Sequence, residues 1–210
     1  EEFAAGKFDI LIGTQMIAKG LDFANVTLVG VVSADQMFMM PDYDSIERAF
    51  STLTQVVGRG GRGEVPGEAV IQTYDPINPV IRLAASQDYP AFYESEIEHR
   101  RANLYPPFCR MCIIGLSSEK EEKARNSAQR MIEIMKEEAS LGGGKLPIRI
   151  LGPVPMRIAR ISSRYRFKIT VKGPYGEAFR DILKRTLARY YQEPGNSGVR
   201  VYCDFNSRES

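Results

Sequence analysis

Residues 164–172 read Arg-Tyr-Arg-Phe-Lys-Ile-Thr-Val-Lys, so charged or polar side chains alternate with apolar ones. Successive side chains of a β-strand point to opposite faces, and a period of two therefore predicts a strand with one apolar and one basic face. The two sets are Tyr165, Phe167, Ile169 and Val171 on the apolar face, and Arg164, Arg166, Lys168 and Lys172 on the basic face. We expect the apolar face to pack on a core and the basic face to be solvated.

The segments around this strand complete a pattern of six elements. We expect further strands over residues 109–116, 148–161 and 199–205, and helices over residues 119–139 and 175–191. The order β-α-β-β-α-β is that of the ferredoxin-like arrangement, in which two helices cover one face of an antiparallel sheet. Two prolines in Tyr105-Pro106-Pro107-Phe108 forbid helix continuation. We therefore place an α+β C-terminal domain at residues 105–210.

Residues 1–104 predict a different architecture. Apolar runs without alternation are typical of strands buried on both faces, as in parallel sheets. Such runs lie at 8–13, 26–32 and 69–73, with a helix predicted over 44–57 and a polar helix over about 90–104. This pattern indicates an α/β layer. Since only three parallel strands can be identified, we expect an incomplete lobe.

The composition is that of a globular protein. The chain has 210 residues, 43% of them hydrophobic, with 28 Lys and Arg against 26 Asp and Glu. No apolar stretch approaches the roughly 20 residues that a membrane helix needs. No initiator Met or signal pattern is present, so we expect the chain to begin within a larger protein. Three Cys cannot form a closed disulfide framework, which favours a reducing cytoplasm.

The charge is unevenly distributed. Residues 145–191 hold 12 Lys or Arg against only Glu177 and Asp181, a local charge of +10 in a chain whose net charge is +2. Segregation of this size is typical of a surface that binds a polyanion. A basic face that is merely solvated is the alternative.

Two stretches carry residues suited to phosphate. Residues 13–23 read Gly-Thr-Gln-Met-Ile-Ala-Lys-Gly-Leu-Asp-Phe, directly after a predicted strand, where open α/β sheets bind ligands. Residues 55–63 read Gln-Val-Val-Gly-Arg-Gly-Gly-Arg-Gly, in which Arg59 and Arg62 form a fork suited to phosphoryl oxygens. Taken alone, the second stretch is also compatible with a loosely RNA-binding arginine-glycine loop or with a turn.

Together the two stretches resemble motifs V and VI of superfamily 2 helicases. The sequence also resembles the PriA family of primosomal replication-restart helicases (primosomal protein N′). The residues that carry this resemblance include 13–23, Pro41-Asp42-Tyr43 and Tyr105-Pro106-Pro107-Phe108. The resemblance covers nearly the whole chain. It implies a RecA-like second helicase lobe and the following site residues: Gln55, Arg59 and Arg62 at the ATP phosphates, with Arg62 as the arginine finger; Gly20 and Asp22 near the nucleotide; Thr14, Gln15 and Lys19 near the DNA backbone.

Other helicase elements are missing from the sequence. The P-loop pattern G-x-x-x-x-G-K-[ST] is absent, and its nearest candidate, Gly144-Lys145-Leu146, ends in Leu. No Walker B acidic cluster follows an apolar strand. The resemblance places these elements in the preceding lobe, so ATP and Mg²⁺ would need that lobe and the chain alone should be inactive. It also implies zinc, bound by a cysteine-rich module upstream of residue 1.

We expect no metal site within the chain itself. Cys109-Arg110-Met111-Cys112 has the spacing of half a zinc site, but residues three apart on a strand point to opposite faces, and only Cys203 remains. His99 lies among charged residues and is expected at the surface. The run Met37 to Met40 is expected to pack, with contact to DNA as the alternative.

The basic strand completes the functional prediction. Arg157 and Arg160 of the preceding strand would extend its basic face, and a sheet of this topology is a platform for nucleic acid. The predicted DNA contacts there are Arg157, Arg160, Arg164, Arg166 and Lys168. An acidic protein tail could use the same surface.

The resemblance implies an ATP-dependent 3′ to 5′ DNA helicase that recognises stalled or branched forks and promotes primosome assembly. Its implied partners are branched and single-stranded DNA, the acidic tail of single-stranded DNA-binding protein, and proteins that load the replicative helicase. The implied location is the nucleoid in the cytoplasm. The alternative function is a stand-alone nucleic-acid-binding module without enzymatic activity.

Overall fold

The computed structural model describes residues 2–3, 5–14, 26–40, 42–58, 67–141 and 146–205. The chain separates into two compact units that divide between Glu98 and His99. The division falls within one helix, α4, which spans Tyr89–Asn103.

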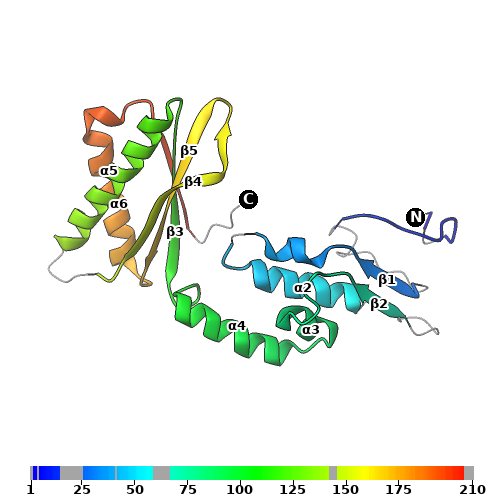
Figure 1. Cartoon of the computed structure of the whole chain (residues 1–210). Coiled ribbons are helices and arrows are strands. Elements are labelled where there is room, and N and C mark those ends of the chain that lie inside the picture. Colours follow the sequence, from blue (N-terminus) through cyan, green and yellow to red (C-terminus); the bar gives the residue numbers. More distant parts are fainter. Residues whose placement is uncertain are drawn as a thin grey trace. The chain divides into compact units, whose positions relative to one another are not determined.

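The first unit holds a two-stranded parallel sheet and a group of helices. Its elements before α4 are β1 (Leu28–Val31), the 3₁₀ helix η1 (Ala34–Phe38), α2 (Ser45–Val57), β2 (Glu68–Ile71) and α3 (Pro79–Ala85). β1 and β2 pair in parallel, as the sequence predicts, with Leu28 opposite Glu68 and Val31 opposite Ile71 (Figure 1).

Helix packing supplies the core of this unit. Phe50 and Leu53 of α2 are buried against Ile81 of α3 and Phe92 of α4. The rings of Phe50 and Phe92 stack with their centroids 3.9 Å apart. Fully burying a side chain of this size contributes about 1.5–3 kcal/mol, so these few contacts stabilise the unit substantially. Helix α3 was not predicted.

The predicted strand over residues 8–13 is wrong. These residues form no strand, and the side chains of Ile10 and Ile12 are 77% and 89% exposed. Within the described residues, the parallel sheet consists of β1 and β2 alone. An apolar run becomes a buried strand only when neighbouring strands and helices cover it, and no described strand pairs with this one.

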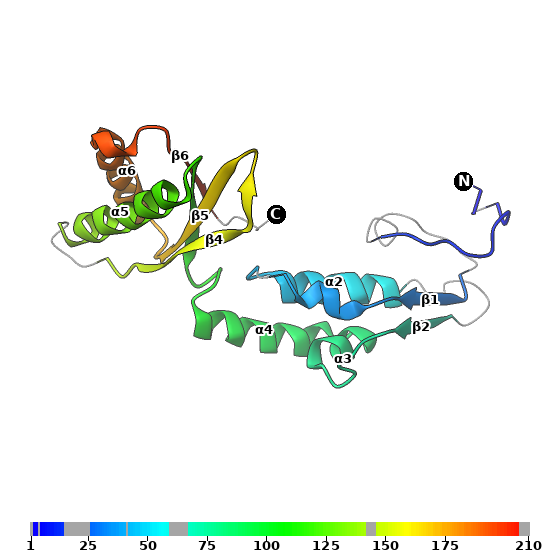
Figure 2. The same ribbon diagram turned by 45° about the horizontal axis from the view of Figure 1, so that its top comes forward.

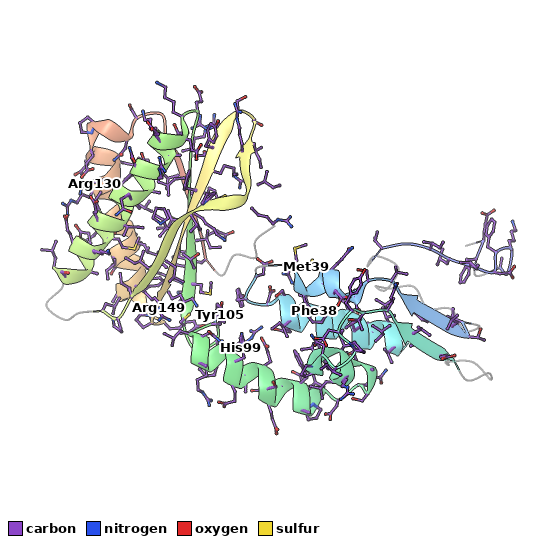
Figure 3. All side chains as sticks on the ribbon, in the orientation of Figure 1. Phe38, Met39, His99, Tyr105, Arg130 and Arg149 are labelled. Carbon is purple, nitrogen blue, oxygen red and sulfur yellow. The ribbon has the colours of Figure 1, made fainter. Side chains whose placement is uncertain are left out.

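The methionine run divides in two. Met37 and Phe38 of η1 pack against the core of the first unit, as expected. Met39 and Met40, in contrast, are 76% and 43% exposed. The packing prediction is therefore confirmed only for the first half of the run (Figure 3).

The second unit has the predicted β-α-β-β-α-β order. Its elements are β3 (Arg110–Ser118), α5 (Glu121–Ser140), β4 (Arg149–Ile161), β5 (Arg164–Gly173), α6 (Glu177–Gln192), the short 3₁₀ helix η2 (Pro194–Asn196) and β6 (Arg200–Phe205). The sheet order is β4-β5-β3-β6, and every adjacent pair is antiparallel. Figures 1 and 2 show α5 and α6 on the same face of this sheet.

Alternation along the central strands builds the core. Phe167, Ile169 and Val171 of β5 are buried against the helices, which confirms the predicted apolar face. Ile114 of β3 lies in the same core. Residues three or four apart on α5 and α6 supply the other side, among them Ala124, Ala128, Met131, Met135, Phe179, Leu183 and Tyr190.

The edge strand β4 is irregular. Its pairing with β5 shifts register between Leu151 and Val154, and again between Pro155 and Arg160. Proline has no N–H to donate to a sheet, and it is therefore tolerated at such an edge. A turn at Ser162 and Ser163, both with positive φ, connects β4 to β5. Among the described residues, no helix is long and apolar enough to cross a membrane.

Candidate nucleic-acid interface

Only two of the predicted motif residues of the first unit are described. Thr14 is exposed at the end of an irregular segment, and Gln55 is exposed in the last turn of α2. The other predicted residues lie outside the described ranges, namely Gln15, Lys19, Gly20, Asp22, Arg59 and Arg62. Their grouping around a nucleotide therefore stays a prediction.

The segments that follow β1 and β2 are joined by side-chain hydrogen bonds to Asp35. The hydroxyl of Thr73, just after β2, donates to Oδ1 of Asp35 at 2.8 Å, and the N–H of Tyr74 donates to Oδ2 at 3.2 Å. The hydrogen bond from Thr73 lowers the pKa of the Asp35 carboxyl. Open α/β sheets bind ligands at this end of their strands. The sequence did not reveal the contact because its residues are 38 positions apart.

The sheet face opposite the helices of the second unit carries cations in register. Directly opposed residues of an antiparallel pair share a face. In one row, Ser117 of β3 lies between Arg166 of β5 and Arg200 of β6. We call this surface the open face, and its next rows are Lys168, Gly115 and Tyr202, then Thr170, Ile113 and Asp204.

Arg166 and Lys168 occupy the face that the alternation predicts. Both are half-buried, whereas Arg200 is exposed. The side chains of Arg166 and Arg200 form no hydrogen bond or ion pair with the part of the chain that the structure describes. Sequence reasoning missed Arg200 and Tyr202, because only the register of β6 against β3 brings them beside the basic strand.

Lys172 corrects the expectation of a solvated basic face. The residue is only 5% exposed, and its Nζ donates to the carbonyl oxygen of Asn103 at 2.8 Å. The same Nζ lies 3.8 Å from the centroid of the Tyr105 ring. Burial lowers the pKa of the Lys172 ammonium group. This end of the face is thus covered by the chain that follows α4.

Arg164 is held by its own sheet. Its Nη2 donates to the carbonyl oxygens of Ser117 at 2.7 Å and of Gly198 at 2.9 Å. Its Nη1 also lies 3.7 Å from Glu119, and the side chain is only 16% exposed. These contacts occupy most of the guanidinium donors, so few of them remain to bind a phosphate.

Arg160 lies on the other face, which corrects the predicted extension of the basic surface. It pairs with Tyr165, and its guanidinium carbon lies 5.0 Å from the centroid of that ring. The register shift before Arg160 is the cause, because it breaks the alternation that a regular strand would have kept. Arg157 lies within the irregular segment itself and is exposed.

On the helix side, carboxylates of α5 pair with Arg185 and Arg189 of α6. Arg185 of α6 contacts Glu138 of α5 at 3.0 Å, and Arg189 of α6 pairs with Glu137 and with Glu138. Pairs of this kind, in which the arginine is at least partly exposed, contribute about 0–1 kcal/mol each. Their main effect here is local neutralisation of Arg185 and Arg189.

Arg130, labelled on α5 in Figure 3, links this helix to the segment that follows α6. Its Nε donates to Glu193 at 3.0 Å and its Nη2 at 2.6 Å, which fixes the chain after α6. Those hydrogen bonds lower the pKa of the Glu193 carboxyl. Arg130 also pairs with Glu133 at 3.0 Å.

The three thiols do not converge. Cys112 is buried in the core, whereas the Sγ of Cys109 donates to the carbonyl oxygen of Leu104 at 3.0 Å. A hydrogen bond with Cys203, together with burial, raises the pKa of the Cys112 thiol. Across the described ranges, no group of three His, Cys, Asp or Glu side chains is placed to hold a metal ion.

Two family models match the chain. The helicase conserved C-terminal domain matches residues 1–64, and the primosomal protein N C-terminal domain matches residues 101–206. The second match covers about half of the chain and nearly all of the unit that carries the open face.

Full-length relatives agree with these matches. The replication restart protein PriA of Bacillus subtilis (strain 168) is 44% identical over 204 residues, which is 97% of this chain and 25% of that protein. PriA of Synechocystis is 43% identical over 176 residues, 83% of this chain and 20% of that protein. PriA of Haemophilus influenzae is 31% identical over 211 residues, which is 100% of this chain and 28% of that protein. The chain thus spans about a quarter of the length of these relatives.

Among solved structures, the de novo designed protein Foldit4 matches over 46% of this chain and 96% of its own length, at a TM-score of 0.31 and 18% identity. The two units define a helicase C-terminal domain joined to a primosomal C-terminal domain. The chain belongs to the PriA family of replication restart proteins, and it corresponds to their C-terminal region.

Proposed function

We propose that the chain supplies the C-terminal part of an ATP-dependent 3′ to 5′ DNA helicase. The complete protein would recognise stalled or branched forks and promote primosome assembly and replication restart. The family match and the relatives named replication restart protein support this proposal. Residues 1–104 would be part of a RecA-like second lobe. The strand order β4-β5-β3-β6 supports a ferredoxin-like assignment for residues 105–210.

In the first unit, we assign the phosphoryl oxygens of ATP to Gln55, Arg59 and Arg62. All three side chains offer N–H donors, and two are cationic, which suits an anion whose charge grows in the transition state. The set offers no carboxylate for Mg²⁺, so the metal and the phosphate cradle would come from another lobe. Gly20 and Asp22 would lie near the nucleotide, and Thr14, Gln15 and Lys19 would hold the tracking strand.

One observation carries the DNA-binding part of the proposal. Arg166, Lys168 and Arg200 share the open face, whereas Arg185 and Arg189 of α6 are paired with carboxylates of α5. A polyanion therefore meets the guanidinium groups of Arg166 and Arg200, whose side chains have no partner among the described residues, and partly neutralised charge on the helix side. Phosphate contacts of this kind supply affinity without sequence preference.

The remaining partners follow from the family alone. We propose the acidic tail of single-stranded DNA-binding protein and the proteins that load the replicative helicase as further partners, in the nucleoid of the cytoplasm. Zinc would be bound only upstream of residue 1.

The test is ATP hydrolysis by the complete protein and by the 210-residue chain. We expect DNA-stimulated turnover and unwinding of forks from the complete protein, and no turnover from the chain alone. Turnover by the chain alone would overturn the division of the site between lobes. A complete protein that binds DNA but neither hydrolyses ATP nor unwinds it would instead be a non-enzymatic binding module.

A further inference from the structure

The ring of Tyr202 lies along the open face instead of standing away from it. A Cβ built on Gly115, directly opposite on β3, would meet Cε1 of this ring at 2.2 Å and its hydroxyl oxygen at 2.7 Å. The hydroxyl lies 3.6 Å from Sδ of Met156, on β4 at the far side of the sheet. A side chain perpendicular to β6 would not reach that edge, so the ring must run along the sheet.

The ring can lie against the sheet because Gly115 has no side chain. Gly115 is buried, and any other residue at this position would collide with Tyr202. Tyr202 nevertheless remains 48% exposed. One side of the ring is thus supported by the backbone of β3, while a large part of it stays accessible to solvent.

Cations lie beside the exposed ring in its own row and in the row on one side of it. Lys168 belongs to the same row, and Arg166 and Arg200 form the adjacent row. Rows on one face are two residues apart, which is about 7 Å along a strand, within reach of long basic side chains. The nearest carboxylate in register is Asp204, on the other side of Tyr202 along β6.

We propose that Tyr202 is a stacking platform for an unpaired base of single-stranded nucleic acid, with Arg166, Lys168 and Arg200 holding the phosphates beside it. The inference rests on the proposed function in one respect, namely that the open face binds nucleic acid. It adds the form of the ligand, because a duplex keeps its base faces stacked and offers none to a protein ring. A supported, exposed aromatic ring among cations is the arrangement that single-strand binders use.

The experiment compares two labelled oligomers on the 210-residue chain by fluorescence anisotropy. One is oligothymidylate of about ten nucleotides, and the other is an abasic strand of equal length and charge. Stacking of one base makes a difference of about 5- to 150-fold in affinity, so wild type should prefer the thymidylate by that factor. Tyr202→Ala should remove the preference and leave affinity for the abasic strand unchanged.

Three variants separate stacking from other effects. Tyr202→Phe keeps the ring and should keep the preference. Gly115→Ala leaves Tyr202 in place but forces its ring off the sheet, and it should lose the preference. Tyr175→Ala removes another exposed tyrosine of the same unit, 56% exposed and outside the sheet, and should behave as wild type. Circular dichroism checks the fold of each variant.

A second measurement needs no variant. Thymidylate in which one base is 5-bromouracil should crosslink to Tyr202 on irradiation, as mapped by mass spectrometry.

Equal affinity for both oligomers in wild type, with Arg166→Ala weakening the binding of both, would overturn the stacking platform but would still support DNA binding by the open face. Binding of neither oligomer, or binding that Arg166→Ala does not alter, would overturn the proposed interface itself. An acidic peptide bound in place of either oligomer would make the face a protein-docking surface.

Discussion

The ammonium group of Lys172 caps the carboxyl end of α4. Its Nζ donates to the carbonyl oxygen of Asn103, the last residue of that helix, at 2.8 Å. The last carbonyls of a helix lack partners within it and carry the negative end of its dipole, so a cation there is favourable. Tyr105, labelled in Figure 3, covers the same ammonium group. A residue of the basic strand is therefore structural.

Replacing Lys172 by Met should lower the free energy of unfolding of the second unit by about 1–3 kcal/mol, because the carbonyl oxygen of Asn103 loses its donor. Urea unfolding at pH 7 measures the loss. Lys184→Met is the matched control, since Lys184 is exposed and should change stability by less than about 0.5 kcal/mol. Equal stability of wild type and Lys172→Met would show that the cap contributes nothing.

The same pair of proteins has a predictable pH dependence. Burial lowers the pKa of Lys172, so the unfolded chain binds more protons between that lowered pKa and the ordinary lysine value of 10.5. Stability of wild type should therefore rise relative to Lys172→Met as pH increases through this window. A stability gap that narrows between pH 8 and pH 10.5 would contradict the burial of a charged lysine.

Glu193→Gln tests the link between Arg130 and the chain after α6. The pKa of Glu193 is lowered from 4.5 by Arg130, so the stabilisation is present above pH 4.5 and is lost as pH falls through the folded-state pKa. In thermal melts, the melting temperature of wild type should exceed that of Glu193→Gln at pH 7, and the two melting temperatures should converge in acid. Glu94→Gln, at an exposed carboxylate of α4, should follow wild type throughout. A gap that persists unchanged to pH 2 would exclude the ion pair as its origin.

Arg62→Ala in the complete protein tests the proposed arginine finger. Removing a cation that acts on the transferred phosphoryl group should lower kcat about 10³-fold or more, with nucleotide binding largely retained. DNA-stimulated ATP hydrolysis measures kcat, and Arg82→Ala, on the exposed side of α3, is the control. An unchanged kcat would assign the finger to another residue, Arg59 first.

The second unit was predictable because its signals are local. The period of two over residues 164–172 requires only neighbouring residues, and Phe167, Ile169 and Val171 are buried accordingly. The strand expected over residues 8–13 failed for the opposite reason, since an apolar run becomes a strand only if neighbouring strands cover it. Helix α3, Pro79–Ala85, is too short for a clear helical period.

The site depends on contacts between residues far apart in sequence. Lys172 follows the alternation of β5, but Asn103, 69 positions away, takes it out of solvent. Arg160 lies on the other face because of a register shift between β4 and β5, which the residue types do not indicate. Tyr202 and Gly115 form a pair only through the register of β6 against β3. Sequence patterns assign side chains to the faces of a strand, whereas tertiary packing decides which of them remain accessible.

The most direct test of the open face is the salt dependence of DNA binding by two matched double variants of the 210-residue chain. Arg166→Gln with Lys168→Gln removes two charges from the open face, and Arg185→Gln with Arg189→Gln removes two from the helix side. For oligothymidylate, the first variant should reduce the slope of log affinity against log salt by about 1.4, at about 0.7 for each lost phosphate contact. The second variant should keep the wild-type slope. An equal reduction of the slope in both variants, or a reduction only in the helix-side variant, would contradict DNA binding by the open face.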